Sequence, residues 1–201
     1  MDKMLATRKK TLQERQKEKS IKRVFEEYKN VLNSTLADIV MVNESCDYFQ
    51  IRFTPNGGHY RGQTLILELK PKHPAHAISY PFRPPLVKLL TPVFHTNVSS
   101  AGSICVDFIY NSEKWMPTYG FESIISAIIL LFDEPEFTQG HYNPQASALY
   151  RKCRKEQSFA EFDVTTRIYY KNMLSKGGQK ILDNFDLMYK EQHSDREPVG
   201  L

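Results

Sequence analysis

Three polar side chains near the middle of the sequence could carry out chemistry at a carbonyl group. Cys105 offers a thiol, and His95 and Asn97 lie ten and eight positions before it. A thiolate is a nucleophile, and an amide N–H can stabilise the negative charge that develops on the oxygen of an attacked carbonyl. The alternative is that Cys105 is a small buried hydrophobic residue, as many free cysteines are. These residue types alone leave both interpretations open.

The composition indicates an intracellular globular protein with a hydrophobic core. Of 201 residues, 41% are hydrophobic and 3 are cysteines, too few and too odd a number for a disulfide framework. No Cys-x-x-Cys pair occurs, so we expect no structural metal site. The most apolar run, residues 124–132, is too short to span a bilayer, and the N-terminus has no apolar signal sequence. We therefore expect reduced cysteines and a cytoplasmic or nuclear location.

The basic character of the sequence is concentrated at its N-terminus. Residues 1–30 contain 10 Lys/Arg and 5 Asp/Glu, whereas the rest of the chain is nearly neutral. Such a charge run is usually a solvated helix face, although a basic helix can also meet an acidic partner. We expect residues 1–18 to form a basic extension, helical or disordered, and we expect neither a membrane nor a nucleic-acid partner.

Periodicity predicts an α+β fold in the order helix, four-stranded antiparallel sheet, loop and further helices. Apolar residues recur at helical spacing over residues 21–32, and residues 121–132 are apolar on nearly every side, which is typical of a central buried helix. Alternating or β-branched stretches predict four strands, at residues 38–42, 48–53, 64–70 and 86–90. Short connections between them favour an antiparallel meander. Residues 91–119 show no periodicity and are predicted to be an ordered loop that carries the active site.

Helices are predicted to dominate the C-terminal part of the chain. Asn143 and Pro144 are typical of a helix cap and a first helical residue. Further helical patterns cover residues 159–174 and 181–189, separated by Gly177-Gly178. We divide the chain into the extension 1–18, a core domain 19–174, and a C-terminal extension 175–201 that holds one short helix and, from residue 192, a disordered tail.

Several motifs in this order resemble the ubiquitin-conjugating enzyme family. Tyr80-Pro81-Phe82-Arg83-Pro84-Pro85 is similar to its proline-rich loop, His95-Thr96-Asn97 to its His-Pro-Asn motif, and Trp115-Met116-Pro117 to its Trp-x-Pro loop. Cys105 falls where that family keeps its catalytic cysteine. The resemblance extends from about residue 21 to about residue 173, three quarters of the chain. It favours the reactive thiol over the buried one.

The resemblance implies a carrier of ubiquitin or a ubiquitin-like modifier, with no tightly bound cofactor. An activating enzyme, which consumes the ATP, would pass the modifier to Cys105 as a thioester, and a substrate lysine would then attack it, usually with a ligase. Asn97 would stabilise the oxyanion or hold the loop, and Asp107 would orient the lysine or simply face solvent. We expect His95 to be structural and not a general base, because a strong base would promote hydrolysis of the thioester.

The resemblance also implies where protein partners bind. The matching positions for activating enzymes and ligases are Lys22, Arg23, Glu26, Phe82, Pro117 and Thr118. Phe82 is the best candidate, since an exposed aromatic side chain can anchor a small interface. Its alternative is local packing against Pro84 and Pro85.

Three departures from the family pattern leave the modifier open. Thr96 replaces the proline of the motif, the spacing from Cys105 to Trp115 is wide and resembles the SUMO-conjugating branch, and the acidic gate beside the cysteine is replaced within residues 139–141. The alternatives are a SUMO-type conjugating enzyme, a non-catalytic ubiquitin-binding adaptor with the same fold, and a cysteine hydrolase that uses Cys105 with His95 or His141.

Overall fold

The structure, a computed structural model, describes residues 2–72, 80–111, 113–135, 142–196 and 198, with the backbone alone for residues 2–13 and 110. Its strands are β1 (Asp38–Met41), β2 (Phe49–Phe53), β3 (Leu65–Lys70) and β4 (Leu86–Leu89). Its helices are α1 (Asp2–Asn33), α2 (Asp107–Tyr110), α3 (Phe121–Asp133), α4 (Pro144–Glu156), α5 (Ala160–Met173) and α6 (Gln179–Gln192), with short helical turns η1 (Gly58–Tyr60) and η2 (Leu174–Gly178). This order confirms the predicted α+β fold.

The four strands form one antiparallel sheet in sequence order, which confirms the predicted meander. Ile39 lies opposite Ile51, Ile51 opposite Leu67, and Leu67 opposite Leu89. Side chains alternate between the two faces of a strand, so these aligned residues share one face. All four are buried, and they form the floor of the main hydrophobic core.

Helix α3 covers that inner face of the sheet. Phe49 meets Phe121 with ring centroids 5.5 Å apart, and Phe53 meets Phe132 at 5.6 Å. This is the central buried helix that the sequence predicts, although Leu130 is 60% exposed. The helix is therefore amphipathic, with its buried residues spaced three and four apart along the side that faces the sheet.

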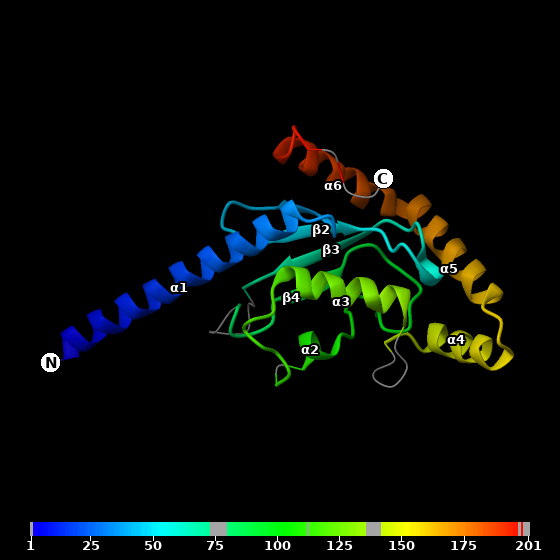
Figure 1. Ribbon diagram of the computed structural model, residues 1–201, viewed down its shortest axis with the longest axis horizontal. Helices are drawn as coiled ribbons and strands as arrows, with labels where there is room; N and C mark the ends of the chain where they lie inside the picture. The colour runs from blue at the N-terminus through cyan, green and yellow to red at the C-terminus, as the bar shows by residue number, and fades with distance from the viewer. Residues whose placement is uncertain (1, 73–79, 112, 136–141, 197, 199–201) are drawn as a thin grey trace.

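Helix α6 covers the opposite face of the sheet, so the sheet is buried between two layers of helices (Figure 1). Val40 and Ile66, which point away from α3, pack with Phe185 and Tyr189 of α6 in a second apolar cluster. The helical stripe in residues 181–189 predicts such a helix, and the structure shows which surface it covers. Gly177, at φ +104°, breaks the helical path between α5 and α6, as the glycine pair predicts.

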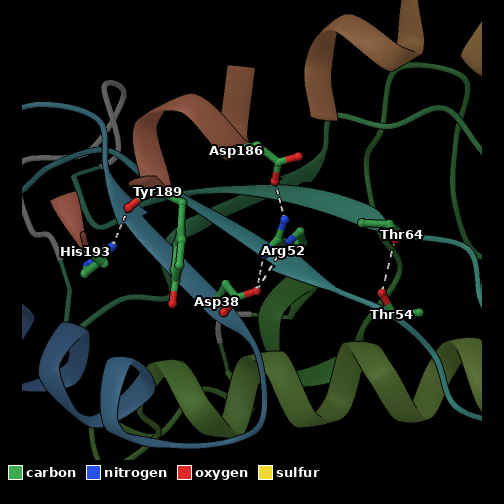
Figure 2. Close-up of polar contacts among 7 residues, drawn as sticks. All are labelled: Asp38, Arg52, Thr54, Thr64, Asp186, Tyr189 and His193. Carbon is green, nitrogen blue, oxygen red and sulfur yellow. Dashed lines mark hydrogen bonds and ion pairs between the residues drawn. The ribbon is translucent and has the colours of Figure 1, made fainter. Parts of the chain in front are cut away.

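A buried ion pair lies under α6 (Figure 2). Arg52 donates to the carboxylate of Asp38 from Nε at 3.0 Å and from Nη2 at 2.7 Å, and its Nη1 contacts the carboxylate of Asp186 on α6. Arg52 and Asp38 are 5% and 2% exposed. The rings of Phe185 and Tyr189 lie 5.1 and 5.6 Å from the guanidinium carbon. The alternating pattern places Arg52 away from the inner core, and α6 then buries it.

At the N-terminal end a helix is one of the two predicted states, whereas the C-terminal end differs from the prediction. Helix α1 is continuous from Asp2, and in Figure 1 its N-terminal half extends beyond the sheet. A disordered tail is predicted from residue 192, yet His193 is buried with Nε2 3.0 Å from the Tyr28 hydroxyl, and Arg196 donates to Leu32 O at 2.6 Å. Within the described helices, none is long and apolar enough to cross a membrane.

Candidate active site

His95 ties the active-site loop to the end of α3. Its Nε2 donates to Leu131 O at 3.1 Å, and its Nδ1 accepts from Asn97 N at 2.9 Å. The ring is fully buried against Tyr60 and Phe132, with centroids 4.9 and 4.7 Å away. Burial lowers the pKa of His95 to about 3, so the imidazole is neutral near pH 7. Because both ring nitrogens are already bonded, neither is available to take a proton from a thiol.

Asn97 and Cys105 are joined across a short antiparallel turn. Cys105 N donates to Asn97 O at 2.9 Å, and Val98 and Ile104 form an isolated bridge just inside this pair. Asn97 is 1% exposed, whereas Cys105 is half-buried and in no disulfide. The structure thus brings together the two residues that the sequence singles out eight positions apart.

Gly102 anchors that turn to the sheet. Leu89 N, in β4, donates to Gly102 O at 2.8 Å. Gly102 has φ +79°, and a Cβ there would lie 2.1 Å from Leu89 O. Only glycine fits this combination of left-handed backbone and close approach. The turn that presents Cys105 is therefore held against the last strand.

Thr96 lies inside the active-site loop and connects it by hydrogen bonds to the residues that precede α4. It is fully buried, and its Oγ1 donates to Asn97 Oδ1 at 2.7 Å. Its carbonyl accepts from Tyr142 N at 3.1 Å and Asn143 N at 3.2 Å. Asn143 in turn caps α4 by accepting from Ala146 N at 3.1 Å, as the Asn-Pro pair predicts. The sequence identifies Thr96 only as a departure from a motif and does not predict these bonds.

The segment after Cys105 is predicted to be loop, but it contains the helix α2, which begins at Asp107. The Asp107 carboxylate lies 2.5 Å from Lys114 Nζ, and both side chains are exposed. An exposed pair of this kind contributes less than about 1 kcal/mol, so another cation can replace the lysine at little cost. Nothing in the sequence pattern indicates that Lys114 pairs with Asp107.

An aromatic cluster packs against α2. Trp115 Nε1 donates to Pro81 O at 2.7 Å, and the Tyr80 hydroxyl donates to Tyr119 O at 3.1 Å. Phe108 of α2 packs on Trp115 and Tyr119, with centroids 6.3 and 4.8 Å apart. The proline-rich segment and the tryptophan loop are therefore one unit, and this unit supports the helix that follows Cys105.

Five of the six predicted partner-binding residues are exposed. Those that are exposed are Lys22, Glu26, Phe82, Pro117 and Thr118. Phe82 is 63% exposed, so packing against Pro84 and Pro85 does not cover it. Met116, which the prediction missed, is 49% exposed. Phe82 follows Pro81 in the sequence, and Met116 follows Trp115. Since Trp115 is hydrogen-bonded to Pro81, Phe82 and Met116 lie on neighbouring loops.

Arg23 differs from the other predicted partner-binding residues. It is partly buried, and its Nε lies 2.6 Å from Glu27 Oε1. Glu27, which the helical pattern places on the solvent side of α1, is 6% exposed and accepts from Phe121 N at 3.0 Å. Arg23 therefore already serves in a contact between α1 and α3.

Two further predictions concern the altered gate and metal binding. Residues 139–141, where the sequence places the altered gate, lie outside the described part of the chain. Among the side chains that the structure does describe, no group of three or more His, Cys, Asp or Glu could hold a metal ion.

Comparisons with known proteins point to one family. Residues 16–164 match the family model described as ubiquitin-conjugating enzyme. Over 77 residues, 38% of this chain, the sequence is 42% identical to Ubiquitin-conjugating enzyme E2 2 of Emericella nidulans and to Ubiquitin-conjugating enzyme E2 1 of Caenorhabditis elegans. It is 39% identical over the same length to Ubiquitin-conjugating enzyme E2 2 of Neurospora crassa. These matches span 49%, 38% and 49% of the three relatives.

The family match includes the sheet and the candidate active site. It contains all four strands, the turn from Asn97 to Cys105, the tryptophan loop and α3. The sheet and helices agree with the α+β fold that this family implies. With about three quarters of its length matched, the chain belongs to the ubiquitin-conjugating enzyme family.

Proposed function

We propose that this protein accepts ubiquitin or a ubiquitin-like modifier as a thioester on Cys105 and transfers it to lysine side chains. The observation that carries the proposal is the 2.9 Å hydrogen bond from Cys105 N to Asn97 O, which places a half-buried thiol next to a residue with an amide side chain. Membership of the family supports a transferase.

Cys105 is the nucleophile of the first step. Its thiolate attacks the thioester carbonyl by which an activating enzyme holds the modifier, and the thiolate of that enzyme leaves. The thiol proton of Cys105 passes to solvent, because the thiolate is the attacking species. ATP is consumed by the activating enzyme, so this chain requires no cofactor of its own.

Asn97 acts in the second step, when a substrate amine attacks the thioester on Cys105. Negative charge develops on the carbonyl oxygen, and the Asn97 side chain donates a hydrogen bond to it. Removal of one such donor costs about 10²–10³ in rate in characterised hydrolases. Collapse expels the Cys105 thiolate and leaves an amide bond, and the amine loses its proton to solvent. His95 supplies no base, since both of its nitrogens are bonded.

Asp107 attracts the incoming lysine. Its carboxylate is exposed two residues after Cys105, and it already binds an ammonium group, that of Lys114. A substrate lysine is chemically the same group, so it can take the place of Lys114 beside the thioester. Exchange at this exposed pair is inexpensive, because such pairs are weak in water.

Protein partners bind at the exposed residues near the tryptophan loop. We assign the contact with activating enzyme and ligase to Phe82, Met116, Pro117 and Thr118, and to the exposed Lys22 and Glu26 of α1. Arg23 contributes less, since it is engaged with Glu27. The expected location of such a carrier is the cytoplasm, the nucleus or both.

Charging assays test this proposal and its alternatives. The protein is incubated with ATP and a panel of modifiers, ubiquitin and SUMO among them, each with its activating enzyme. The expected product is a reducer-sensitive adduct that is lost in Cys105→Ala and kept in Cys46→Ala, whose thiol is also half-buried.

The outcomes separate the candidate functions. Charging with SUMO alone identifies a SUMO-type enzyme. Ubiquitin binding without any adduct identifies an adaptor, and hydrolysis of a modifier ester without activating enzyme identifies a hydrolase. Absence of an adduct with every modifier contradicts the proposed carrier.

A further inference from the structure

The Thr96 hydroxyl is a buried polar group that the proposed reaction does not yet use. Thr96 is 0% exposed and Asn97 is 1% exposed. The hydroxyl donates to Asn97 Oδ1 at 2.7 Å, the usual length of a good O–H···O hydrogen bond. A hydrogen bond inside a protein is electrostatically stronger than one in water, so this contact constrains the amide.

The backbone around this contact is fixed on both sides. Asn97 N donates to His95 Nδ1 at 2.9 Å, and Asn97 O accepts from Cys105 N at 2.9 Å. Thr96 O accepts from the amides of Tyr142 and Asn143. With the main chain held, the position of the Asn97 amide depends on its two side-chain torsions alone.

In the structure the hydroxyl pairs with the oxygen branch of that amide. An amide carries its acceptor oxygen and its two N–H donors on opposite branches of one plane. The bond to Thr96 holds the oxygen on the threonine side, so the Nδ2 donors occupy the other branch. If the amide turned by 180°, Nδ2 would face the hydroxyl, which can also accept, and Oδ1 would replace the N–H donors on the other branch.

We propose that Thr96 is a positioning residue, whose hydroxyl holds the Asn97 amide with its N–H donors toward the thioester carbonyl on Cys105. This inference rests on the proposed function. In the step concerned, a neutral amine attacks the carbonyl carbon, the carbonyl oxygen becomes the oxyanion, and the oxyanion accepts from Nδ2. The C–S bond then breaks, Cys105 Sγ leaves as thiolate, and the former amine gives its proton to solvent.

A proline between His95 and Asn97, as in the family motif, cannot act in this way. Proline has neither a hydroxyl nor an N–H group. In this chain the bond comes from a side chain whose χ1 angle is stiff, because threonine is branched at Cβ. The threonine at this position of the motif therefore orients Asn97 by a hydrogen bond that proline could not make.

Single-turnover transfer tests this inference. Protein charged with ubiquitin is isolated, ATP and Mg²⁺ are removed with apyrase and EDTA, and loss of the thioester is followed at increasing free L-lysine concentration. We expect Thr96→Val, which has nearly the same shape, to lower the saturating rate about tenfold, less than the 10²–10³-fold cost of losing an oxyanion donor. The half-saturating lysine concentration stays unchanged, because Thr96 does not contact lysine. Thr96→Ser keeps the hydroxyl and should transfer within about threefold of wild type, the usual context scatter for a retained hydrogen bond.

A second background separates positioning from a general effect on the fold. In Asn97→Ala, the further change Thr96→Val should not slow transfer, because the amide it acts through is gone. If Thr96→Val does not fold, Thr96→Ala and Thr96→Ser form the pair that differs only in the hydroxyl. Equal saturating rates with and without the hydroxyl, or equal slowing in the Asn97→Ala background, overturn the inference. Failure of the wild-type chain to charge at all is a different result, and it removes the proposed function together with this inference.

Discussion

The carboxylate of Glu27 accepts a hydrogen bond from the backbone N of Phe121, 94 positions later in the chain, at 3.0 Å. Glu27 lies on α1, and Phe121 is the first residue of α3. A carboxylate at the N-terminus of a helix satisfies one of its unpaired N–H groups and interacts favourably with its dipole. Near the other end of α3, Leu131 O accepts from His95. Helix α3 thus connects α1 to the loop that holds the active site.

Gly120 leaves the space that the Glu27 carboxylate occupies. A Cβ at residue 120 would lie 2.3 Å from Glu27 Oε2. We expect Gly120→Ala to displace the carboxylate and lower the free energy of unfolding by about 1–3 kcal/mol, the cost of leaving a buried polar group unsatisfied. Urea unfolding measures this change. Gly57→Ala is the matched control, because its Cβ would find its nearest neighbour, Asp133 Oδ1, at 3.4 Å. Equal losses in the two variants would contradict this explanation.

His95 makes the stability of the fold sensitive to acid. Its pKa is lowered to about 3 in the folded protein by burial, against an ordinary value of about 6.5. Between these two values the unfolded chain binds a proton that the folded chain does not. The stabilisation is therefore fully present above about pH 6.5 and decreases as pH falls toward 3, by about 1.4 kcal/mol per pH unit.

Replacement of His95 tests this dependence. We expect His95→Gln to be less stable than wild type at pH 8, because the bonds to Leu131 and Asn97 are disturbed. Between pH 6 and pH 4, however, its free energy of unfolding should fall less steeply, because one titrating group is absent. Urea unfolding at half-unit pH intervals measures both slopes, and identical slopes would show that His95 is not the group responsible.

The sequence predicts local features of this protein well, because they depend on near neighbours. The alternation of Phe49, Ile51 and Phe53 identifies β2, and the turn residues around it set the meander. The Asn143-Pro144 pair identifies the start of α4. In each case the physical cause lies within a few residues of the effect.

The sequence does not predict contacts between distant segments. The stripe that contains Phe185 and Tyr189 predicts a helix, but not that this helix buries Arg52 of β2. At the active site, the spacing of Asn97 and Cys105 suggests the pair, whereas the hydroxyl bond from Thr96 depends on side-chain torsions. The partners of a polar residue become visible only when the fold brings distant segments together.

Arg52 is expected to be far more important for stability than its surface partner. Arg52→Met would leave the carboxylate of Asp38, 2% exposed, without its cation, and removal of one member of a buried pair costs about 3–5 kcal/mol. Asp186→Asn removes only the half-exposed partner on α6 and should cost less than about 1 kcal/mol (Figure 2). Thermal and urea unfolding of the two variants measure the difference. A cost for Asp186→Asn that equals that of Arg52→Met would mean that the ion pair with α6 is the dominant one.

Phe82 offers the sharpest test of the proposed partner surface. Its side chain is 63% exposed, so Phe82→Ala should change the free energy of unfolding by less than about 0.5 kcal/mol. An aromatic anchor in an interface contributes about 2 kcal/mol or more, so the apparent affinity for activating enzyme should fall at least about tenfold. Initial charging rates at increasing activating-enzyme concentration measure this affinity. The control is Leu187→Ala, which removes a side chain of similar exposure, 59%, from α6 on the outer face of the sheet. If both variants charge at the wild-type rate, the partner does not bind at Phe82; if both are slowed equally, the loss is not specific to the proline-rich segment.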